Sequence, residues 1–385
     1  MTQPDPAAPT ALPADWRDGH FALRAEGPEG PLALALSGGQ VMDMTPAYGT
    51  VSAWLNGADP VSAIGAEGEP LALDLPALLA GEGPYRLLAP FDLQALKACG
   101  VTYARSMLER VIEERCRGDA SQAERVRGEI RDIIGDDLAA LRPGSAEAIA
   151  LKENLIARGW WSQYLEVGIG PDAEVFTKGQ SLSAVGSGAL IGIHPGSDWN
   201  NPEPEVVLAV NAAGTIVGAA LGNDVNLRDV EGRSALLLGR AKDNNAACAI
   251  GPAIRLFADD FGIEDIRAAE IRLTITGTDG FTLDEAGKVG SISRDPTDLV
   301  GQMLNAHHQY PDGAALFLGT PFSPSKDRGA PGAGFTHRMD DVVRIASPRL
   351  GALSNTVRRT DECPPWTFGI GALMANLARR GLPKA

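Results

Sequence analysis

The chain has 385 residues and a mass of 40.3 kDa, which is long enough to bury a large hydrophobic core in one domain or two. Its 49 acidic and 34 basic side chains give a formal net charge of −15. A body this negative repels phosphate backbones and anionic lipid surfaces. Nucleic acid and membranes are therefore not expected as partners, and a small anionic substrate would need a compensating cation.

The first residues show neither the basic region nor the apolar region of a signal peptide, and the apolar runs are too short to cross a bilayer. We therefore expect a cytoplasmic protein. The four cysteines are scattered without a CxxC pair, so neither a zinc site nor a disulfide framework is expected.

The first quarter of the chain predicts a small separate domain over residues 1–90, whose role the pattern leaves open. Residues 1–15 are rich in Pro and Ala and predict a loose tail. From His20 to about Pro90, short apolar runs broken by Gly and Pro predict strands. Residues 91–385 then form the main, catalytic domain.

Helical periodicity begins near Asp92 and continues to about residue 160. Apolar residues recur at helical spacing, namely Leu93, Leu96, Met107, Leu108, Val111 and Ile112. Ser121 with Glu124 forms a capping box that opens a second predicted helix, through Ile134. A third helix is predicted from about Ala146 to Arg158.

The rest of the chain, from Tyr164 onward, predicts strands, turns and long loops. The expected strands are YLEVGI, VFTK, ALIGIHP, EPEVVLAV, TIVGAALG, IRLTITG, ALFLGTP and DVVRIASP. They do not alternate with helices as in a doubly wound parallel sheet, so an α+β chain with a mixed or antiparallel roll or sandwich fits better. An amphipathic helix is predicted over about Phe368–Arg380.

Two glutamates, Glu203 and Glu205, precede a strongly apolar run. In a strand they point to the same face as Val207 and Ala209. If that face is buried, the two carboxylates need a cation, and carboxylate oxygens without Cys or His suit Mg²⁺, Ca²⁺ or Mn²⁺ rather than zinc. The alternative is a strand that only begins here, with both glutamates in solvent, because Pro204 is typical of strand starts and edges.

Two further polar residues follow. Asp224 ends a run of small residues and offers a third oxygen ligand, although an Asn-Asp turn bonded to its own backbone is the alternative. Lys242 follows another apolar run. A lysine among acids can orient an enolate, or act as a base if its pKa is lowered, whereas the alternative is a solvated side chain.

Taken in chain order, these segments resemble the fumarylacetoacetate hydrolase superfamily. The shared pattern is Glu-x-Glu, then Asn-Asp-x-x-x-Arg-Asp, then Gly-x-x-Lys, then a late Gly-Thr-Pro, and it runs from about Leu88 to the C-terminus. The resemblance implies a mixed β-sandwich roll with peripheral helices, assembled as a homodimer or a dimer of dimers. The roles that it implies are Mg²⁺ or Mn²⁺ ligation by Glu203, Glu205 and Asp224, catalysis by Lys242, and substrate binding by Lys178, Gly319 and Thr320.

One departure from the family pattern bears on the reaction. Hydrolases of this superfamily carry Asn-Tyr-x-x-His, followed three residues later by Glu, to activate water. This chain has Ser106 in place of that His and keeps the acid as Glu109. Serine without a partner is no general base at neutral pH. We therefore expect no hydrolysis of a carbon–carbon bond. Proton transfer is assigned to Lys242 or Glu109, with Ser106 and Arg105 orienting substrate hydroxyls.

Longer stretches resemble the sugar-acid dehydratase branch of the superfamily, among them LERVIEERCRGD, WNNPEPEVVL and GAALGNDVNLRD. This implies a carbon–oxygen lyase of oxidative pentose catabolism. Its substrate would be a small anionic 2-keto sugar acid, 2-keto-3-deoxy-D-xylonate or its L-arabinonate counterpart, with the first expected. A metal-stabilised enolate would lose the C4 hydroxyl, and tautomerisation would then deliver the aldehyde at C5, giving 2-oxoglutarate semialdehyde. Such a β-elimination needs a base and an acid but no water-activating dyad.

Two alternatives remain. A hydrolase of acylpyruvates or a decarboxylase of oxaloacetate would use the same metal site, and Ser106 argues against the hydrolytic form. A binding protein that keeps only the fold is the other alternative. Buried carboxylates with a lysine argue against it, because a site without chemistry has no physical need of them.

Overall fold

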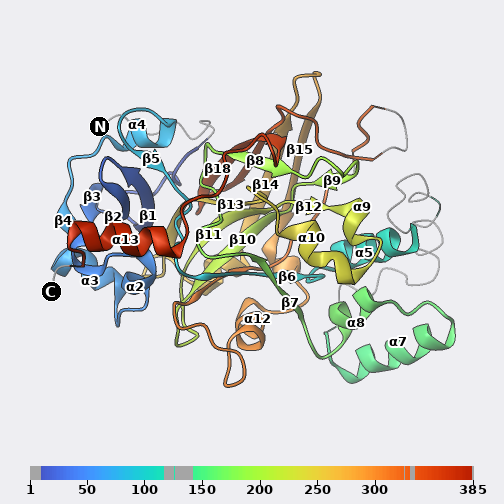
Figure 1. Cartoon of the computed structure of the whole chain (residues 1–385). Helices are drawn as coiled ribbons and strands as arrows, with labels where there is room; N and C mark the ends of the chain where they lie inside the picture. Colours follow the sequence, from blue (N-terminus) through green and yellow to red (C-terminus); the bar gives the residue numbers. More distant parts are fainter. Residues whose placement is uncertain (1–9, 117–124, 126–141, 325, 330–333, 384–385) are drawn as a thin grey trace.

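The computed structural model describes residues 10–116, 125, 142–324, 326–329 and 334–383, except for the side chains of residues 104–106, 108, 109 and 113. Figure 1 shows two sheets in the middle of the molecule. The first strands and the C-terminal helix lie at one end, and the helices of residues 104–169 lie at the other.

The larger sheet contains strands drawn from residues 20–317. Its order is β4-β3-β2-β1-β13-β11-β10-β16-β6-β7, with β5 paired to β1. Neighbours are antiparallel apart from β16 and β6, which are parallel. The strands are β1 (His20–Gly27), β2 (Gly30–Ser37), β3 (Gln40–Asp43), β4 (Glu69–Pro70), β5 (Arg86–Leu87), β6 (Ala95–Gly100), β7 (Glu174–Gly179), β10 (Pro204–Val210), β11 (Ile216–Asp224), β13 (Cys248–Leu256) and β16 (Ala314–Phe317).

A second, mixed sheet packs against this one. Its order is β15-β14-β17-β18-β8, and only β18 and β8 are parallel. Its strands are β8 (Leu190–Ile193), β14 (Glu270–Thr276), β15 (Thr282–Lys288), β17 (Val342–Ser347) and β18 (Gly351–Arg359). A short pair, β9 (Asn200–Asn201) and β12 (Asn226–Leu227), lies apart from both.

The main core lies between the two sheets, and β10 is covered on both faces. Val206 and Leu208 pack in one cluster with Ile345 of the second sheet, whereas Val207 and Ala209 pack in another. A strand that is buried on both faces has an unbroken apolar sequence. Residues 206–210 of β10 form such a sequence.

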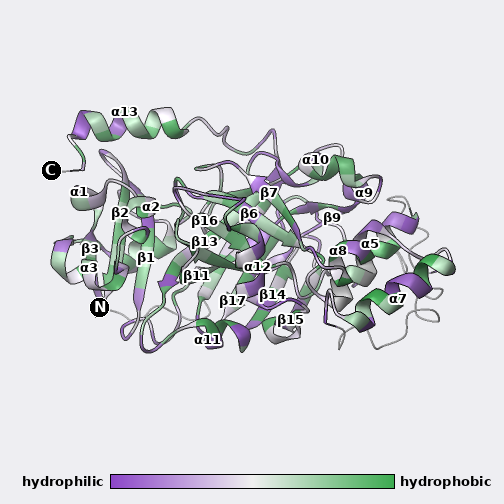
Figure 2. Ribbon diagram, turned by 90° about the horizontal axis from the view of Figure 1, so that it is seen from below, coloured by the Kyte–Doolittle hydropathy of each residue, from purple (hydrophilic) through white to green (hydrophobic). Residues whose placement is uncertain are grey.

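The helices lie at the periphery. They are α1 (Thr45–Tyr48), α2 (Val51–Leu55), α3 (Pro60–Glu67), α4 (Leu75–Ala80), α5 (Ala104–Cys116), α7 (Ala146–Ala157), α8 (Gln163–Ile169), α9 (Arg228–Glu231), α10 (Leu238–Lys242), α11 (Ile263–Arg267), α12 (Pro296–Met303) and α13 (Ile370–Arg380), with 3₁₀ turns η3 (Ala235–Leu237) and η4 (Val289–Ser291). Figure 2 shows α13 outside the N-terminal strands with hydrophobic and hydrophilic residues interspersed, and Asn376 anchors it by donating to the Glu29 carbonyl.

Most of the expected elements are present, and the predicted roll with peripheral helices is confirmed. The strands expected in VFTK, EPEVVLAV and IRLTITG are β7, β10 and β14, and the final helix is α13. The third predicted helix is α7. The second, from Ser121 to Ile134, falls outside the described residues apart from residue 125.

Two segments differ from their predictions. The periodicity of Leu93 and Leu96 predicted a helix, but this segment contributes β6, which lies between β16 and β7, so tertiary pairing overrides the local pattern. YLEVGI was expected as a strand but forms most of α8. The missed signal is Ser162, whose hydroxyl accepts from the Leu165 N–H as an N-cap.

The N-terminal region is joined to the rest by backbone pairing. In β1, Phe21 and Ala22 pair with Arg255 and Ile254 of β13, so the first strands extend the main sheet. The described end of the expected tail is packed rather than loose, because Ala11 pairs with the Ala352 backbone. The described part of this region, from residue 10 onward, also holds four short helices that the strand prediction missed. A domain boundary near residue 90 stays a prediction.

Two further observations concern the environment of the chain. None of the described helices has the length and apolarity needed to span a membrane. The four cysteines are free and buried. Burial raises the pKa of the Cys248 thiol to about 12, so this thiol stays protonated at neutral pH.

Candidate active site

Three buried carboxylates meet where β10 begins and β11 ends. Glu203 directly precedes β10, Glu205 lies within it, and Asp224 is the last residue of β11. Antiparallel pairing of these strands brings the three together, and one ligand atom of each lies within 4.8 Å of the others. Their exposures are 2%, 1% and 1%. The solvent-exposed alternatives for these residues therefore do not hold, whereas their assignment as metal ligands stays a prediction.

Backbone contacts fix Glu203 although it stands outside the strand. Its N–H donates to Asn223 Oδ1 at 3.1 Å, and its carbonyl accepts from the Asp224 N–H at 3.0 Å. A carboxylate that is buried needs such a rigid frame, because a displaced charge would lose its partners without gaining water.

Lys242 lies between two of the carboxylates. It ends α10, and its Nζ is 2.5 Å from Glu203 Oε2 and 2.9 Å from Asp224 Oδ2. Burial alone would lower the pKa of Lys242, but Asp224 and Glu203 outweigh burial and raise it. The side chain is thus a buried ammonium, not a solvated lysine and not a base of lowered pKa.

Lys178 supports the site from β7. Its Nζ is 2.8 Å from Asp224 Oδ1 and donates to the carbonyls of Val225 and Lys242. Burial alone would raise the pKa of Asp224, but the two lysines outweigh burial and lower it. These contacts make Lys178 a support for Asp224, and its expected contact with substrate stays a prediction.

Arg110 is a site residue that the sequence reasoning missed. Its guanidinium on α5 pairs with Glu203 Oε1 and, at 2.9 Å, with Glu231 Oε2 of α9. All three side chains are almost fully buried. The sequence did contain a signal for a buried arginine. Arg110 lies three residues after Met107, and therefore on the apolar side of an amphipathic helix.

Glu205 differs from the other two carboxylates. Among the described residues no cation lies within ion-pair distance of it, and its Oε2 accepts only the Gly319 N–H, at 2.7 Å. Burial and the charges of Asp224 and Glu203 raise the pKa of Glu205 well above its usual range. The neutral form is therefore favoured unless further positive charge arrives.

The donor set fits a hard divalent cation. Three carboxylates provide oxygen ligands, as Mg²⁺ and Mn²⁺ prefer, and among the described residues no cation lies within ion-pair distance of Glu205, which accepts only the Gly319 N–H. We infer that Glu203, Glu205 and Asp224 would hold such an ion.

The Gly319-Thr320 turn closes the site beside Glu205. Thr320 is buried, and its hydroxyl donates to the Phe322 carbonyl at 2.7 Å. Gly319 has φ +91°, and a Cβ there would overlap the Thr102 hydroxyl, which donates to the Leu318 carbonyl. Substrate binding by Gly319 and Thr320 stays a prediction, but the need for glycine at 319 is structural.

Replacing Gly319 with alanine is expected to lower the free energy of unfolding by about 2 kcal/mol or more, because strain at positive φ adds to steric overlap. It should also weaken divalent-ion binding, since the N–H that orients Glu205 must move. Urea unfolding and ion titration would measure both effects. The control is Gly239→Ala in α10, where a Cβ meets nothing within 4 Å and stability should be unchanged or slightly higher. An unaltered Gly319→Ala protein would contradict this prediction.

Tyr103 is a second buried group beside Glu205 without an expected role. Burial and the Glu205 charge raise the pKa of its phenol, so the hydroxyl stays protonated at neutral pH. The residue adjoins the segment with Arg105, Ser106 and Glu109. The structure places these three on α5, but their side chains lie outside the described part, so their roles stay predictions.

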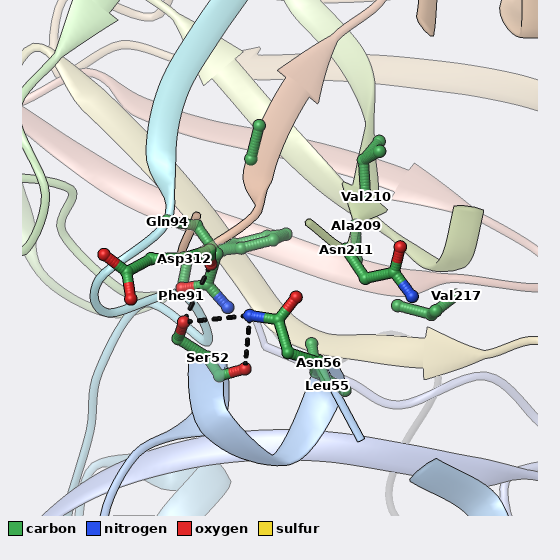
Figure 3. Close-up of a pocket in the computed structure, with 11 residues that line it drawn as sticks. Ser52, Leu55, Asn56, Phe91, Gln94, Ala209, Val210, Asn211, Val217 and Asp312 are labelled. Carbon is green, nitrogen blue, oxygen red and sulfur yellow. Dashed lines mark hydrogen bonds between the residues drawn. The ribbon is translucent and has the colours of Figure 1, made fainter. Parts of the chain in front are cut away.

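A small pocket lies at the opposite end of β10 (Figure 3). Asn56 Nδ2 there donates to the Ser52 carbonyl, and the Ser52 hydroxyl donates to the Asp312 carbonyl. Val210 of its lining is five residues from Glu205, or about 16 Å along a strand. The pocket is thus separate from the carboxylates. Its lining residues are Ser52, Leu55, Asn56, Phe91, Gln94, Ala209, Val210, Asn211, Val217, Asp312 and Ala314.

Two curated proteins that are similar to this chain in sequence are dehydratases. The chain is 31% identical over 194 residues to the probable 2-keto-3-deoxyxylonate dehydratase of Haloferax volcanii, which covers 50% of this chain and 63% of that protein. It is 28% identical over 186 residues to the 2-dehydro-3-deoxy-D-arabinonate dehydratase of Saccharolobus solfataricus, covering 48% and 59%. The chain thus spans about six tenths of the length of the curated relatives it matches.

The fold is shared over a longer stretch. A 2-keto-3-deoxy-D-arabinonate dehydratase solved with magnesium and 2,5-dioxopentanoate superimposes with a TM-score of 0.61 and 19% identity, over 88% of this chain and 99% of that one. A fumarylacetoacetate hydrolase from Exiguobacterium antarcticum gives 0.56 and 15%, over 88% and 99%. At these identities the likeness concerns the fold.

The family match covers the segment that carries the three carboxylates, both lysines and the Gly-Thr turn. Residues 171–358 match the model of the fumarylacetoacetate (FAA) hydrolase C-terminal family. This confirms the resemblance seen in the sequence. Residues 171–358 of this chain are therefore similar to fumarylacetoacetate hydrolase C-terminal domains.

Proposed function

We propose that this protein is a metal-dependent dehydratase of 2-keto-3-deoxy-pentonates, with 2-keto-3-deoxy-D-xylonate as substrate and 2-oxoglutarate semialdehyde as product. The observation that carries the proposal is the triad of Glu203, Glu205 and Asp224, fully buried beside the Lys242 ammonium. The two dehydratase relatives support the substrate class. The product proposed is the 2,5-dioxopentanoate with which one solved dehydratase of this fold is complexed.

The three carboxylates would hold Mg²⁺, with Mn²⁺ as a substitute. When bound, the ion would supply Lewis-acid stabilisation of negative charge on the substrate oxygens, which acidifies the proton at C3. The residues of the chain have the other tasks. Glu203, Glu205 and Asp224 are fixed by backbone and cation contacts, so the site is formed before substrate arrives.

Lys242 supplies the proton for the leaving hydroxyl at C4. Its ammonium carries that proton at neutral pH, because its pKa is raised by Asp224 and Glu203. The proton at C3 then requires a base, and Glu109 on α5 takes this role. Ser106 and Arg105 from the same helix orient the substrate hydroxyls, and Gly319 with Thr320 faces the substrate carboxylate.

Location and assembly belong to the same proposal. The protein acts in the cytoplasm, and the superfamily resemblance implies that it assembles as a homodimer or a dimer of dimers. The formal net charge of −15 makes a bound cation more important, since an anionic keto acid is otherwise repelled.

The test is direct. The purified protein, freed of metal with EDTA, is supplied with Mg²⁺ and with either the D-xylonate or the L-arabinonate compound. A coupled NAD⁺-dependent aldehyde dehydrogenase follows the semialdehyde. We expect product only with Mg²⁺, and faster from the D-xylonate compound. If neither compound gives product while Mg²⁺ is bound, the dehydratase proposal is wrong, and acylpyruvates and oxaloacetate are tested next.

A further inference from the structure

Each carboxylate of the triad has one oxygen held by a group other than Lys242. Arg110 pairs with Glu203 Oε1, Lys178 with Asp224 Oδ1 at 2.8 Å, and the Gly319 N–H donates to Glu205 Oε2 at 2.7 Å. The second oxygens of Glu203 and Asp224 face the Lys242 ammonium. A divalent ion would take the oxygens of Glu203 and Asp224 that now face Lys242, and the contacts of Arg110 and Lys178 oppose the use of the other oxygen of each.

The contact made by Arg110 differs from the other two because the same side chain also binds a second acid. The guanidinium spans two acids from different elements, Glu203 before β10 and Glu231 in α9. It is 7% exposed, so it has no room to swing into solvent. The planar guanidinium between two carboxylates keeps its hydrogen-bonding geometry better than a lysine ammonium would. Its positive charge also repels a second cation from the same oxygen.

The number of oxygens offered separates the two common divalent ions. Ca²⁺ takes six to eight oxygens at about 2.3–2.6 Å and often binds a carboxylate through both oxygens, whereas Mg²⁺ takes six at about 2.0–2.1 Å. Three one-oxygen ligands leave three positions of an octahedron, enough for a chelating keto acid and one water. The same three ligands leave Ca²⁺ under-coordinated unless one of them turns to bind through both oxygens.

We propose that Arg110 determines the metal specificity of the site: by holding Glu203 Oε1, it keeps Glu203 a one-oxygen ligand and disfavours Ca²⁺ relative to Mg²⁺ and Mn²⁺. This role rests on the metal site of the proposed function and deepens it. Arg110 acts through Glu203 and is a positioning residue, not a catalytic one.

The experiment measures ion binding in the absence of substrate. Metal-free protein is titrated with Mn²⁺, and free Mn²⁺ is followed by electron paramagnetic resonance. Competition with Mg²⁺ and Ca²⁺ then gives the ratio of their dissociation constants. We expect wild type to favour Mg²⁺ and Arg110→Gln to shift the ratio toward Ca²⁺ by about tenfold, since removal of partners behind a metal ligand typically changes affinity 10–100-fold.

Three variants separate specificity from charge and folding. Arg115→Gln, on the same helix but exposed and stacked on Trp160, should leave the ratio unchanged. Glu231→Gln changes the local charge but leaves Arg110 on Glu203, so it should alter both affinities together. Arg110→Lys keeps a cation near Glu203 and should retain most of the preference. Circular dichroism checks that each variant is folded.

The outcomes are distinct. A tenfold shift of the ratio in Arg110→Gln alone supports the role. Equal changes in both affinities, or an unchanged ratio in a folded variant, would overturn it while leaving the dehydratase proposal intact. No binding of either ion by wild type would overturn the metal site itself and this role with it. Absence of dehydratase turnover with normal ion binding would refute only the proposed reaction.

Discussion

Replacing Glu205 with glutamine is expected to remove metal-dependent activity and leave the metal-free protein as stable as wild type. Glu205 is the triad member without a described cation in ion-pair contact, and its raised pKa keeps it neutral without a metal. Glutamine has the same shape as the neutral acid and accepts the Gly319 N–H equally well. Loss of the carboxylate should weaken ion binding by at least about a hundredfold, while the free energy of unfolding changes by less than about 0.5 kcal/mol.

The matched control is Glu203→Gln, which removes a ligand of the same kind from a different setting. Glu203 is the shared partner of Arg110 and Lys242, so its neutralisation leaves two buried cations without that anion and should cost about 3 kcal/mol. Ion titration and urea unfolding of both variants test the contrast. Full metal affinity in Glu205→Gln would show that the ligand set is wrong, and equal destabilisation of the two variants would show that the charges around them are misassigned.

Replacing Lys242 with methionine is expected to have the second large effect, and on two properties at once. The ammonium is a proposed proton donor, so turnover should fall about 10²–10⁴-fold. It is also the shared counter-ion of Glu203 and Asp224. Removing it from a buried pair should lower the free energy of unfolding by about 3–5 kcal/mol.

Added Mg²⁺ distinguishes the two parts of this prediction. A divalent ion that binds the carboxylates would replace the missing positive charge, so Mg²⁺ should raise the melting temperature of Lys242→Met more than that of wild type. Activity should stay low, because the ion carries no proton to the leaving group. Near-normal turnover would remove Lys242 from the reaction. An unchanged melting temperature with Mg²⁺ would contradict the counter-ion role.

The sequence was sufficient to single out the three buried carboxylates but not the network of contacts behind them. Glu203, Glu205 and Asp224 lie within 22 residues and at strand ends, where period-two alternation and a single antiparallel pairing bring them together. Arg110 and Glu231 come from separate helices, and their meeting depends on how those helices pack against the sheet. No local pattern encodes such a contact, although an arginine on the apolar side of a helix was a usable signal.

The same distinction explains the errors in the fold. The local sequence of residues 95–100 does not favour an extended strand. These residues are extended because they pair with β16 and β7 on either side, and long-range pairing of this kind overrides local secondary-structure propensity. By contrast, the error at α8 was local. The Ser162 N-cap was present in the sequence, and a short apolar run after it was mistaken for a strand because period alone does not separate short helices from strands.

The place of β6 in the main sheet shows that the segment matched by the family model depends on residues outside it. The matched segment begins at residue 171, yet its first strand, β7, reaches the sheet only across β6, which precedes that boundary. A fragment starting at 171 would leave β7, and with it Lys178, without a neighbouring strand, and would also lack Arg110. The matched segment is therefore not a complete folding unit, and shortening this protein to it would remove both the strand that pairs with β7 and the arginine that pairs with Glu203.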